Sequence, residues 1–227
     1  MKKLSFKGAI LLIISVLIIS CSKDDNPSEE NSTTVNAADY LYYISGKLNG
    51  EPFVYGFKAN ATTLEYTATV GKSGGCSIDN SDYSGVNYNA GVNPDFDSSL
   101  PSIDFEFIRF YLCSNMQSSS EVFNDMFPVK SYSLATNNDN ITGSTGDVGI
   151  SYSPNIQENL YYTSYGGVQS GQFIITSSIE ANVYLLDVLV STNQQIEGSF
   201  SVKLYNANDS SDVIEITDGK FKIDLSH

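Results

Sequence analysis

The feature that most constrains this chain is a succession of short segments in which apolar and polar residues alternate, separated by turn-forming residues. Alternation with a period of two is the pattern of half-buried β-strands. In residues 196–207, IEGSFSVKLYNA, the side chains of Phe200, Val202 and Leu204 fall on one face. No stretch after residue 20 keeps a helical period over three turns, and SSSEVFNDMF at 118–127 favours one short helix at most. The sequence therefore predicts an all-β protein.

The order of these segments predicts the architecture. Asn49-Gly50 favours a type I′ hairpin that pairs Ile44 with Tyr55 and Gly46 with Phe53, and Asp218-Gly219 favours a second hairpin within 213–225. Other strands are expected at 63–70, 103–113, 127–134, 146–153, 172–179, 183–190 and 196–207. Short strands with turn signals between them predict an antiparallel β-sandwich or jelly-roll-like fold with long polar loops. We expect residues 39–227 to form this single domain.

Three segments leave alternatives open. Residues 71–102 are polar and long for a loop, so they either carry function or hide short strands. Within 103–113 the apolar phase changes near Phe107 and Ile108, which indicates either a β-bulge or burial on both faces. Residues 183–190, VYLLDVLV, are apolar on both faces apart from Asp187, which is typical of a central strand.

Two charged residues interrupt apolar strands. Arg109, the only arginine, lies in 103–113, and Asp187 lies in 183–190. A buried carboxylate needs a partner, so the sequence predicts a buried ion pair between Arg109 and Asp187. The alternative is that each side chain points to solvent from an edge strand.

The N-terminus has the parts of a secretory signal peptide. Lys2, Lys3 and Lys7 precede an apolar run at 9–20, AILLIISVLIIS, which is shorter than the roughly 20 residues of a membrane-spanning helix. The sequence LIISC at 17–21 resembles the lipobox of bacterial lipoproteins. That resemblance implies removal of the signal peptide 1–20 and acylation of Cys21, with palmitate among the acyl chains. More than one acyl chain is expected, because a single one does not anchor a protein stably in a membrane. The alternative is an ordinary secretory signal with an incidental cysteine.

The segment after Cys21 is acidic. Lys23-Asp24-Asp25 resembles the export tag of surface lipoproteins of the Bacteroidota, which implies a lipid anchor in the outer membrane and a domain that faces the cell exterior. The composition of 22–38 suits a solvated linker equally well, since Val35 is its only large apolar residue. We interpret 21–38 as the acylated cysteine and a flexible acidic tether.

Two motifs lie in the C-terminal third, EGSFSV at 197–202 and IEITDGKF at 214–221. They resemble the C-terminal motifs of a family of uncharacterised Bacteroidota lipoproteins, and ISGKLNGEPF at 44–53 is similar to the start of such proteins. It implies a β-rich, lipid-anchored domain with an ITDGKF-type β-hairpin near its C-terminus. It implies no reaction and no catalytic residue.

Charge and histidine content exclude several functions. Without residues 1–20 the chain keeps nine basic and 26 acidic residues, a net charge of −17, which repels nucleic acid. The only histidine is His227, the last residue, so Ser-His-Asp catalysis and histidine-based metal sites are not expected. A carboxylate pair among Asp104, Glu106 and Asp187 would be needed for glycoside hydrolysis. We expect no enzyme and no cofactor.

Two further sites are candidates. Cys76 and Cys113 either form a disulfide, as in an oxidising compartment, or remain buried thiols. The oxygen-rich stretches 79–82 and 137–147 lack the spacing of an EF-hand, so a calcium site there competes with ordinary turn chemistry.

The remaining functional signal is aromatic. Six aromatic residues lie in two polar segments, and tyrosine rings can stack on sugars; they are Tyr83, Tyr88, Phe96, Tyr161, Tyr162 and Tyr165. They favour a non-catalytic binding module for an extracellular glycan or peptide. The alternative is a structural or accessory lipoprotein that docks onto an outer-membrane protein complex. A contiguous aromatic cleft would indicate the first function, and an exposed apolar patch the second.

Overall fold

The computed structural model describes residues 39–60, 66–74, 83–94, 99–112, 119–137 and 147–226, which belong to one compact unit. The described residues form an all-β fold with one short helix, α2 (Ser119–Met126), and every pair of strands is antiparallel, so the predicted fold class is confirmed. The strands are β1 (Tyr40–Leu48), β2 (Glu51–Lys58), β3 (Tyr66–Gly74), β4 (Tyr83–Pro94), β5 (Ser102–Leu112), β6 (Ser131–Tyr132), β7 (Val148–Ser153), β8 (Tyr162–Thr163), β9 (Gln172–Glu180), β10 (Val183–Leu185), β11 (Val188–Ser191), β12 (Asn193–Asn206) and β13 (Val213–Ser226).

Eleven of the described strands belong to one sheet. Its main path is β2-β1-β13-β12-β8-β7-β5-β4-β3. The long strand β12 divides its pairing, because residues 194–201 pair with β9 while Tyr205 and Asn206 pair with β8. β9 in turn pairs with the short β6. Only β10 and β11 stand apart, as a separate two-stranded hairpin.

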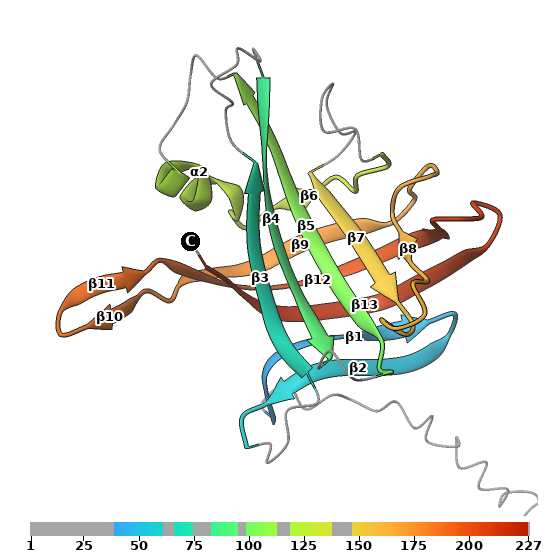
Figure 1. Cartoon of the computed structure of the whole chain (residues 1–227), viewed down its shortest axis with the longest axis horizontal. Helices are drawn as coiled ribbons and strands as arrows, with labels where there is room; N and C mark the ends of the chain where they lie inside the picture. Colours follow the sequence, from blue (N-terminus) through green and yellow to red (C-terminus); the bar gives the residue numbers. More distant parts are fainter. Residues whose placement is uncertain are drawn as a thin grey trace, which may run out of the picture. The chain divides into compact units, whose positions relative to one another are not determined.

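The sheet curls so that its two halves face each other across the core. Figure 1 shows β3, β4, β5 and β7 crossing in front of β9, β12 and β13. Phe105 of β5 lies between the halves, with its ring 5.2 Å from the rings of Phe173, Phe200 and Phe221 in edge-on geometry. All four side chains are buried. Edge-to-face contacts of this kind add to the stabilisation from apolar burial.

The two predicted hairpins have different outcomes. β1 and β2 pair as expected, with Ile44 opposite Tyr55 and Gly46 opposite Phe53. The hairpin predicted at Asp218-Gly219 is wrong, because β13 runs without reversal from Val213 to Ser226. The residue pair forms a β-bulge instead, where Asp218 has a φ of 53° and the registers with β1 and β12 both shift. An Asp-Gly pair supplies the positive φ that either a turn or a bulge needs.

The polar segment 71–102 hides strand β4. Tyr88, Ala90 and Val92 are buried on the inner face of β4, while asparagines alternate with them. This confirms the alternative that the segment contains strands, whose bounds the asparagines do not indicate. β5 pairs with β4 and β7 without a register shift, so it has no bulge there. Phe107 and Ile108 are both buried, which confirms the alternative of burial on both faces.

Candidate functional site

The β10–β11 hairpin extends the β9–β12 ladder beyond the sheet. Glu180 pairs with Gln194, the amide of Ala181 donates a 2.8 Å hydrogen bond to the carbonyl of Asn193, and Val183 then pairs with Ser191. Strand β13 ends at Ser226, opposite Asn193, so no described strand accompanies β10 and β11 past this level. Figure 1 shows the hairpin as an arm that projects to the left of the sheet.

The tip of this hairpin is a tight turn built from two residues. Leu185 pairs with Val188, and between them Leu186 and Asp187 have φ angles of 49° and 64°. Positive φ at both central residues is the mark of a type I′ turn, for which Asn-Gly and Asp-Gly are preferred. A leucine in the left-handed region costs about 1–2 kcal/mol. The turn therefore carries a residue that its backbone conformation disfavours.

The hairpin is apolar and exposed on both of its faces. Each of its apolar side chains is at least 45% exposed, and Leu186 at the tip is 91% exposed. The exposed apolar residues are Val183, Tyr184, Leu185, Leu186, Val188, Leu189 and Val190. The prediction that 183–190 forms a buried central strand is therefore wrong. A run that is apolar on both faces suits a central strand, but it equally suits a hairpin whose two faces are both free.

The hairpin projects from the end of the sheet at which the described chain begins. Tyr43 of β1 pairs with Lys222 of β13, and β1 is antiparallel to β13, so the first residue of β1 lies toward the Ser226 end. Ser226 pairs with Asn193 at the hairpin base. The start of β1 and the base of the hairpin therefore share one end of the sheet, and any segment that precedes residue 39 joins the fold there.

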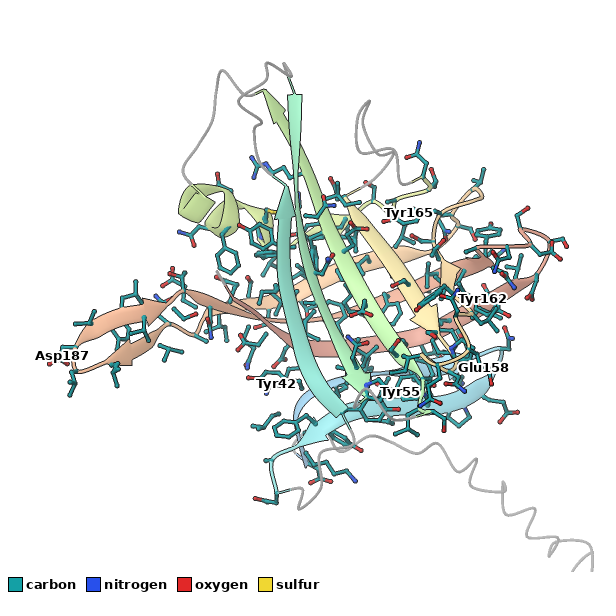
Figure 2. The ribbon with its side chains drawn as sticks, in the orientation of Figure 1. Tyr42, Tyr55, Glu158, Tyr162, Tyr165 and Asp187 are labelled. Carbon is teal, nitrogen blue, oxygen red and sulfur yellow. The ribbon has the colours of Figure 1, made fainter. Side chains whose placement is uncertain are left out.

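The predicted ion pair between Arg109 and Asp187 is wrong. Asp187 is exposed in the turn at the far tip of the hairpin, as Figure 2 shows, whereas Arg109 lies in β5 on the body of the sheet. The prediction treats 183–190 as one buried strand, which implies a buried carboxylate. Because the run folds back on itself at Asp187, the carboxylate remains in water and needs no cation within the fold.

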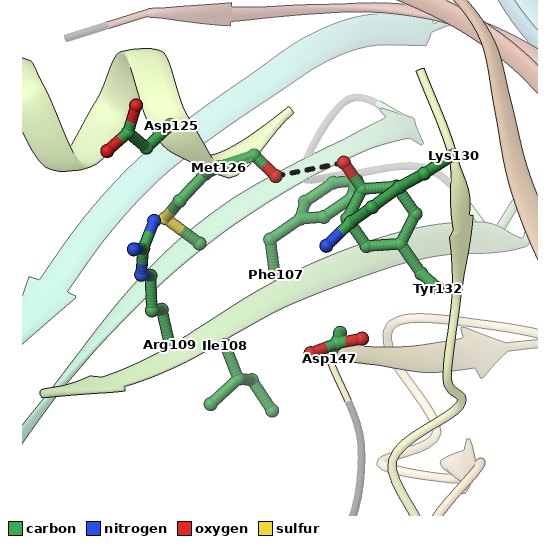
Figure 3. Close-up of a pocket in the computed structure, with 8 residues that line it drawn as sticks. All are labelled: Phe107, Ile108, Arg109, Asp125, Met126, Lys130, Tyr132 and Asp147. Atoms are coloured by element: carbon green, nitrogen blue, oxygen red, sulfur yellow. Dashed lines mark hydrogen bonds between the residues drawn. The ribbon is translucent and has the colours of Figure 1, made fainter. Parts of the chain in front are cut away.

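Arg109 instead borders a surface pocket of about 220 Å³ beside α2 (Figure 3). The Nζ atom of Lys130 lies 4.6 Å from the centre of the Tyr132 ring in this pocket. Oδ2 of Asp147 accepts hydrogen bonds from the amide and hydroxyl of Ser133. The pocket has two cationic and two anionic side chains, Arg109, Lys130, Asp125 and Asp147. Its charges balance, so it has no net charge with which to select an ion.

The aromatic residues predicted to bind a ligand do not come together. Tyr88 is fully buried, with its ring 5.3 Å from Phe123 and 5.9 Å from Phe127 in edge-on geometry, so its predicted role in a binding loop is wrong. Phe96 lies outside the described residues, and Tyr83 is described only as the first residue of β4. Tyr88 faces inward because β4 is a core strand and not a loop.

The three tyrosines around β8 have separate environments. Tyr161 is exposed, and the hydroxyl of Tyr162 donates a 2.8 Å hydrogen bond to Oδ2 of Asp212. The hydroxyl of Tyr165 donates to Oε2 of Glu106 on β5. Two of the three hydroxyls therefore hold loops to strands. The side chains of Tyr162 and Tyr165 are half-buried, and that of Tyr161 is exposed.

The remaining predicted sites lie outside the described residues. These are Cys21, Cys76 and Cys113, together with the oxygen-rich stretch 79–82 and residues 138–146 of the second stretch. Among the residues that the structure does describe, no group of three acidic, cysteine or histidine side chains could hold a metal ion. No helix in the described ranges is long and apolar enough to cross a membrane.

Comparisons with known proteins place the chain in no group. No family model, no curated protein and no solved structure matches it. The functional argument therefore depends on the fold itself, an all-β antiparallel domain with a projecting apolar hairpin.

The sequence does contain a signal for this hairpin. Val183–Leu185 and Val188–Ser191 are two short strands of high β propensity on either side of a two-residue link that ends in Asp187. Asn182 and Asn193 flank the run on both sides. A two-residue loop between apolar strands is typical of a type I′ turn. The leucine at its first position does not indicate such a turn, because asparagine, aspartate or glycine is preferred there.

Proposed function

We propose that this protein is a non-catalytic accessory lipoprotein, anchored in the outer membrane and facing the cell exterior, that docks onto a membrane protein complex through the β10–β11 hairpin. The observation that carries this proposal is the exposure of apolar side chains on both faces of that hairpin. Soluble domains rarely expose a contiguous apolar surface of this kind unless another molecule covers it.

The position of the hairpin supports a role close to the membrane. If Cys21 is acylated, 17 residues separate the anchor from residue 39, where the described chain begins. A flexible segment of that length has a mean span of about 20–25 Å. The hairpin projects from the same end of the sheet as the start of β1. The anchor and the hairpin would then act at one end of the domain.

A glycan- or peptide-binding module is less well supported. That function needs the six predicted aromatic residues, or most of them, to line one surface. Tyr88 is in the core, and the hydroxyls of Tyr162 and Tyr165 bind carboxylates of the fold. The described part of these segments therefore offers Tyr161 alone as a freely exposed ring.

The test compares full-length proteins in their native membrane after solubilisation in mild detergent. Replacing Leu185 and Leu189 with threonine keeps β propensity but removes an apolar side chain from each face of the hairpin. The wild-type protein should migrate in a large complex, and the double variant as a free chain. Val168→Thr is the matched control, because Val168 is 88% exposed but lies outside the hairpin.

A wild-type protein that migrates as a free chain would contradict the docking proposal, as would a double variant that remains in the complex. Cys21→Ser tests the anchor separately. It should move the protein out of the membrane fraction and abolish labelling by a palmitate analogue. Labelling that persists in Cys21→Ser would contradict the proposed lipidation site.

A further inference from the structure

We infer that the partner of the β10–β11 hairpin is a protein with a two-walled apolar cleft, a free β-strand edge along the cleft, and a basic side chain where the hairpin tip arrives. This inference rests on the proposed docking function and specifies its partner. Four properties of the hairpin support it: its two apolar faces, its unpaired edges, the carboxylate at its tip and the strained leucine beside that carboxylate.

The two apolar faces require a partner with two walls. Tyr184 pairs with Leu189, so these two side chains share one face of the hairpin. The adjacent pair of Leu185 and Val188 has its side chains on the opposite face. A flat surface would cover one face and leave the other in water. A cleft covers both, which explains why the side chains of Val183–Leu185 and of residues 188–190 are apolar on both faces.

The edges of the hairpin argue against the lipid bilayer as the occupant. In the described part of the chain, β10 and β11 pair only with each other. Each strand therefore presents backbone N–H and C=O groups on its outer edge. Open sheet edges are not tolerated in the hydrocarbon region, because lipid offers no hydrogen bonds. A strand edge in a protein cleft can pair with β10 or β11 by strand addition.

The charge of the hairpin tip favours a partner protein with a basic side chain at the contact. Asp187 would be the first group to enter any environment that receives the hairpin, and a desolvated carboxylate requires a cation. The chain has no lysine or arginine between Lys130 and Lys203, so the hairpin has no attraction for anionic lipid headgroups. A second copy of this chain without residues 1–20 would bring a further net charge of −17. A protein with a lysine or arginine in its cleft complements Asp187 without these costs.

Leu186 is an independent indication of contact at the tip. Its backbone has a left-handed conformation with a φ of 49° and its side chain is 91% exposed, so in the free protein the backbone is strained and the side chain is in water. Asparagine or glycine would suit the turn better. A pocket at the floor of the cleft that accepts the leucine side chain accounts for both features.

The experiment places a photo-crosslinking amino acid at Tyr184 in one full-length protein and at Leu185 in another, and illuminates intact cells. These positions lie on opposite faces of the hairpin, and Val168 is the exposed control position outside it. We expect both hairpin positions to form an adduct with one and the same other protein, and Val168 to form none. Adding Asp187→Lys should reduce both adducts at least about tenfold, because it places like charges together.

Two purified-protein measurements exclude the other occupants. Vesicles of phosphatidylethanolamine and phosphatidylglycerol in a 3:1 ratio should not bind the protein lacking its acyl chains, and sedimentation should show a monomer. A lipid adduct, vesicle binding that Leu186→Asn abolishes, or an adduct between two copies would overturn the partner class while leaving docking by the hairpin intact. Adducts with one protein from one face only, or adducts that survive Asp187→Lys, would also overturn it. No adduct from either face would contradict both the inference and the proposed function.

Discussion

Tyr165 and Glu106 lie 59 residues apart in the sequence and are joined by a 2.5 Å hydrogen bond from the tyrosine hydroxyl to Oε2 of the carboxylate. The second carboxylate oxygen, Oε1, accepts a 2.7 Å hydrogen bond from the side-chain amide of Asn87. Burial raises the pKa of Tyr165 above its ordinary value, and the hydrogen bond to Glu106 raises it further. These contacts fasten the segment that follows β8 to strands β4 and β5.

Tyr165→Phe should therefore destabilise the domain. The change leaves Glu106 with one donor fewer in a partly buried site, and a hydrogen bond to a charged group contributes about 1.5–3 kcal/mol. Tyr161→Phe is the matched control, since Tyr161 is exposed four residues earlier and should change stability by less than about 0.5 kcal/mol. Urea unfolding at pH 7 measures both variants, and equal midpoints would contradict this account.

Gly149→Ala should disrupt the hydrogen bond between Tyr165 and Glu106 by displacing the tyrosine. A Cβ atom at Gly149 would overlap with the hydroxyl of Tyr165, so the ring must move away from Glu106. We expect a destabilisation of about 1–3 kcal/mol by the overpacking mechanism. The effects of Gly149→Ala and Tyr165→Phe should not add, because both remove the hydrogen bond to Glu106. A double variant that shows the full sum of the two effects would mean that Gly149 and Tyr165 act independently.

The strands with regular alternation could be predicted from sequence, and those with unusual composition could not. The β1–β2 hairpin followed from Asn49-Gly50, and the inward residues of β12 from their period of two. The sequence left a strand within 71–102 as one of two alternatives, because asparagine is typical of turns. The asparagines of β4 alternate with the buried Tyr88, Ala90 and Val92. Local composition therefore does not indicate β4 clearly. Its pairing with β3 on one side and with β5 on the other specifies it.

The candidate site was missed for a different physical reason. The sequence shows which residues are apolar but not whether another strand covers them. Its composition indicates a strand in the middle of the sheet for 183–190. In the structure β13 ends at Ser226, which pairs with Asn193, so β13 does not extend alongside this run. The error also placed Asp187 in the core and produced a false ion pair with Arg109. Only the three-dimensional register of β12 with β13 shows that the hairpin has no neighbour among the described strands.

Asp224 should make stability depend on pH. Burial raises the pKa of its carboxyl above the ordinary 3.8, and the hydrogen bond from the hydroxyl of Tyr42, at 3.3 Å, opposes that rise. Oδ1 of Asp224 is buried without a hydrogen-bond partner in the described structure. The folded state therefore favours the protonated acid. The stability contributed by Asp224 is present below pH 3.8 and is lost as the pH rises through the higher folded-state pKa.

Asp224→Asn removes this titration. Relative to the wild type, the variant should gain stability as the pH rises above 3.8 and keep a constant advantage once the pH is above the folded-state pKa of Asp224. The gain should be below about 1 kcal/mol, since solvent screens a half-exposed carboxylate. Thermal unfolding across this pH range measures the difference. A variant that is less stable than the wild type at pH 7 would show that the carboxylate charge is favourable in the fold.

Leu186→Asn should order the hairpin even though it removes the apolar tip. Asparagine accepts the positive φ of 49° that leucine adopts here, so the change relieves about 1 kcal/mol of local strain. Because a peripheral hairpin opens locally, this gain should appear in its own amide protons and hardly in global unfolding. Hydrogen exchange of the β10 and β11 amides should slow by about fivefold, the equivalent of about 1 kcal/mol. Val168→Asn, at an equally exposed site outside the hairpin, should leave these amides unchanged. Faster exchange in Leu186→Asn would mean that the leucine side chain stabilises the free hairpin, and the strain at the tip would then need no partner to explain it.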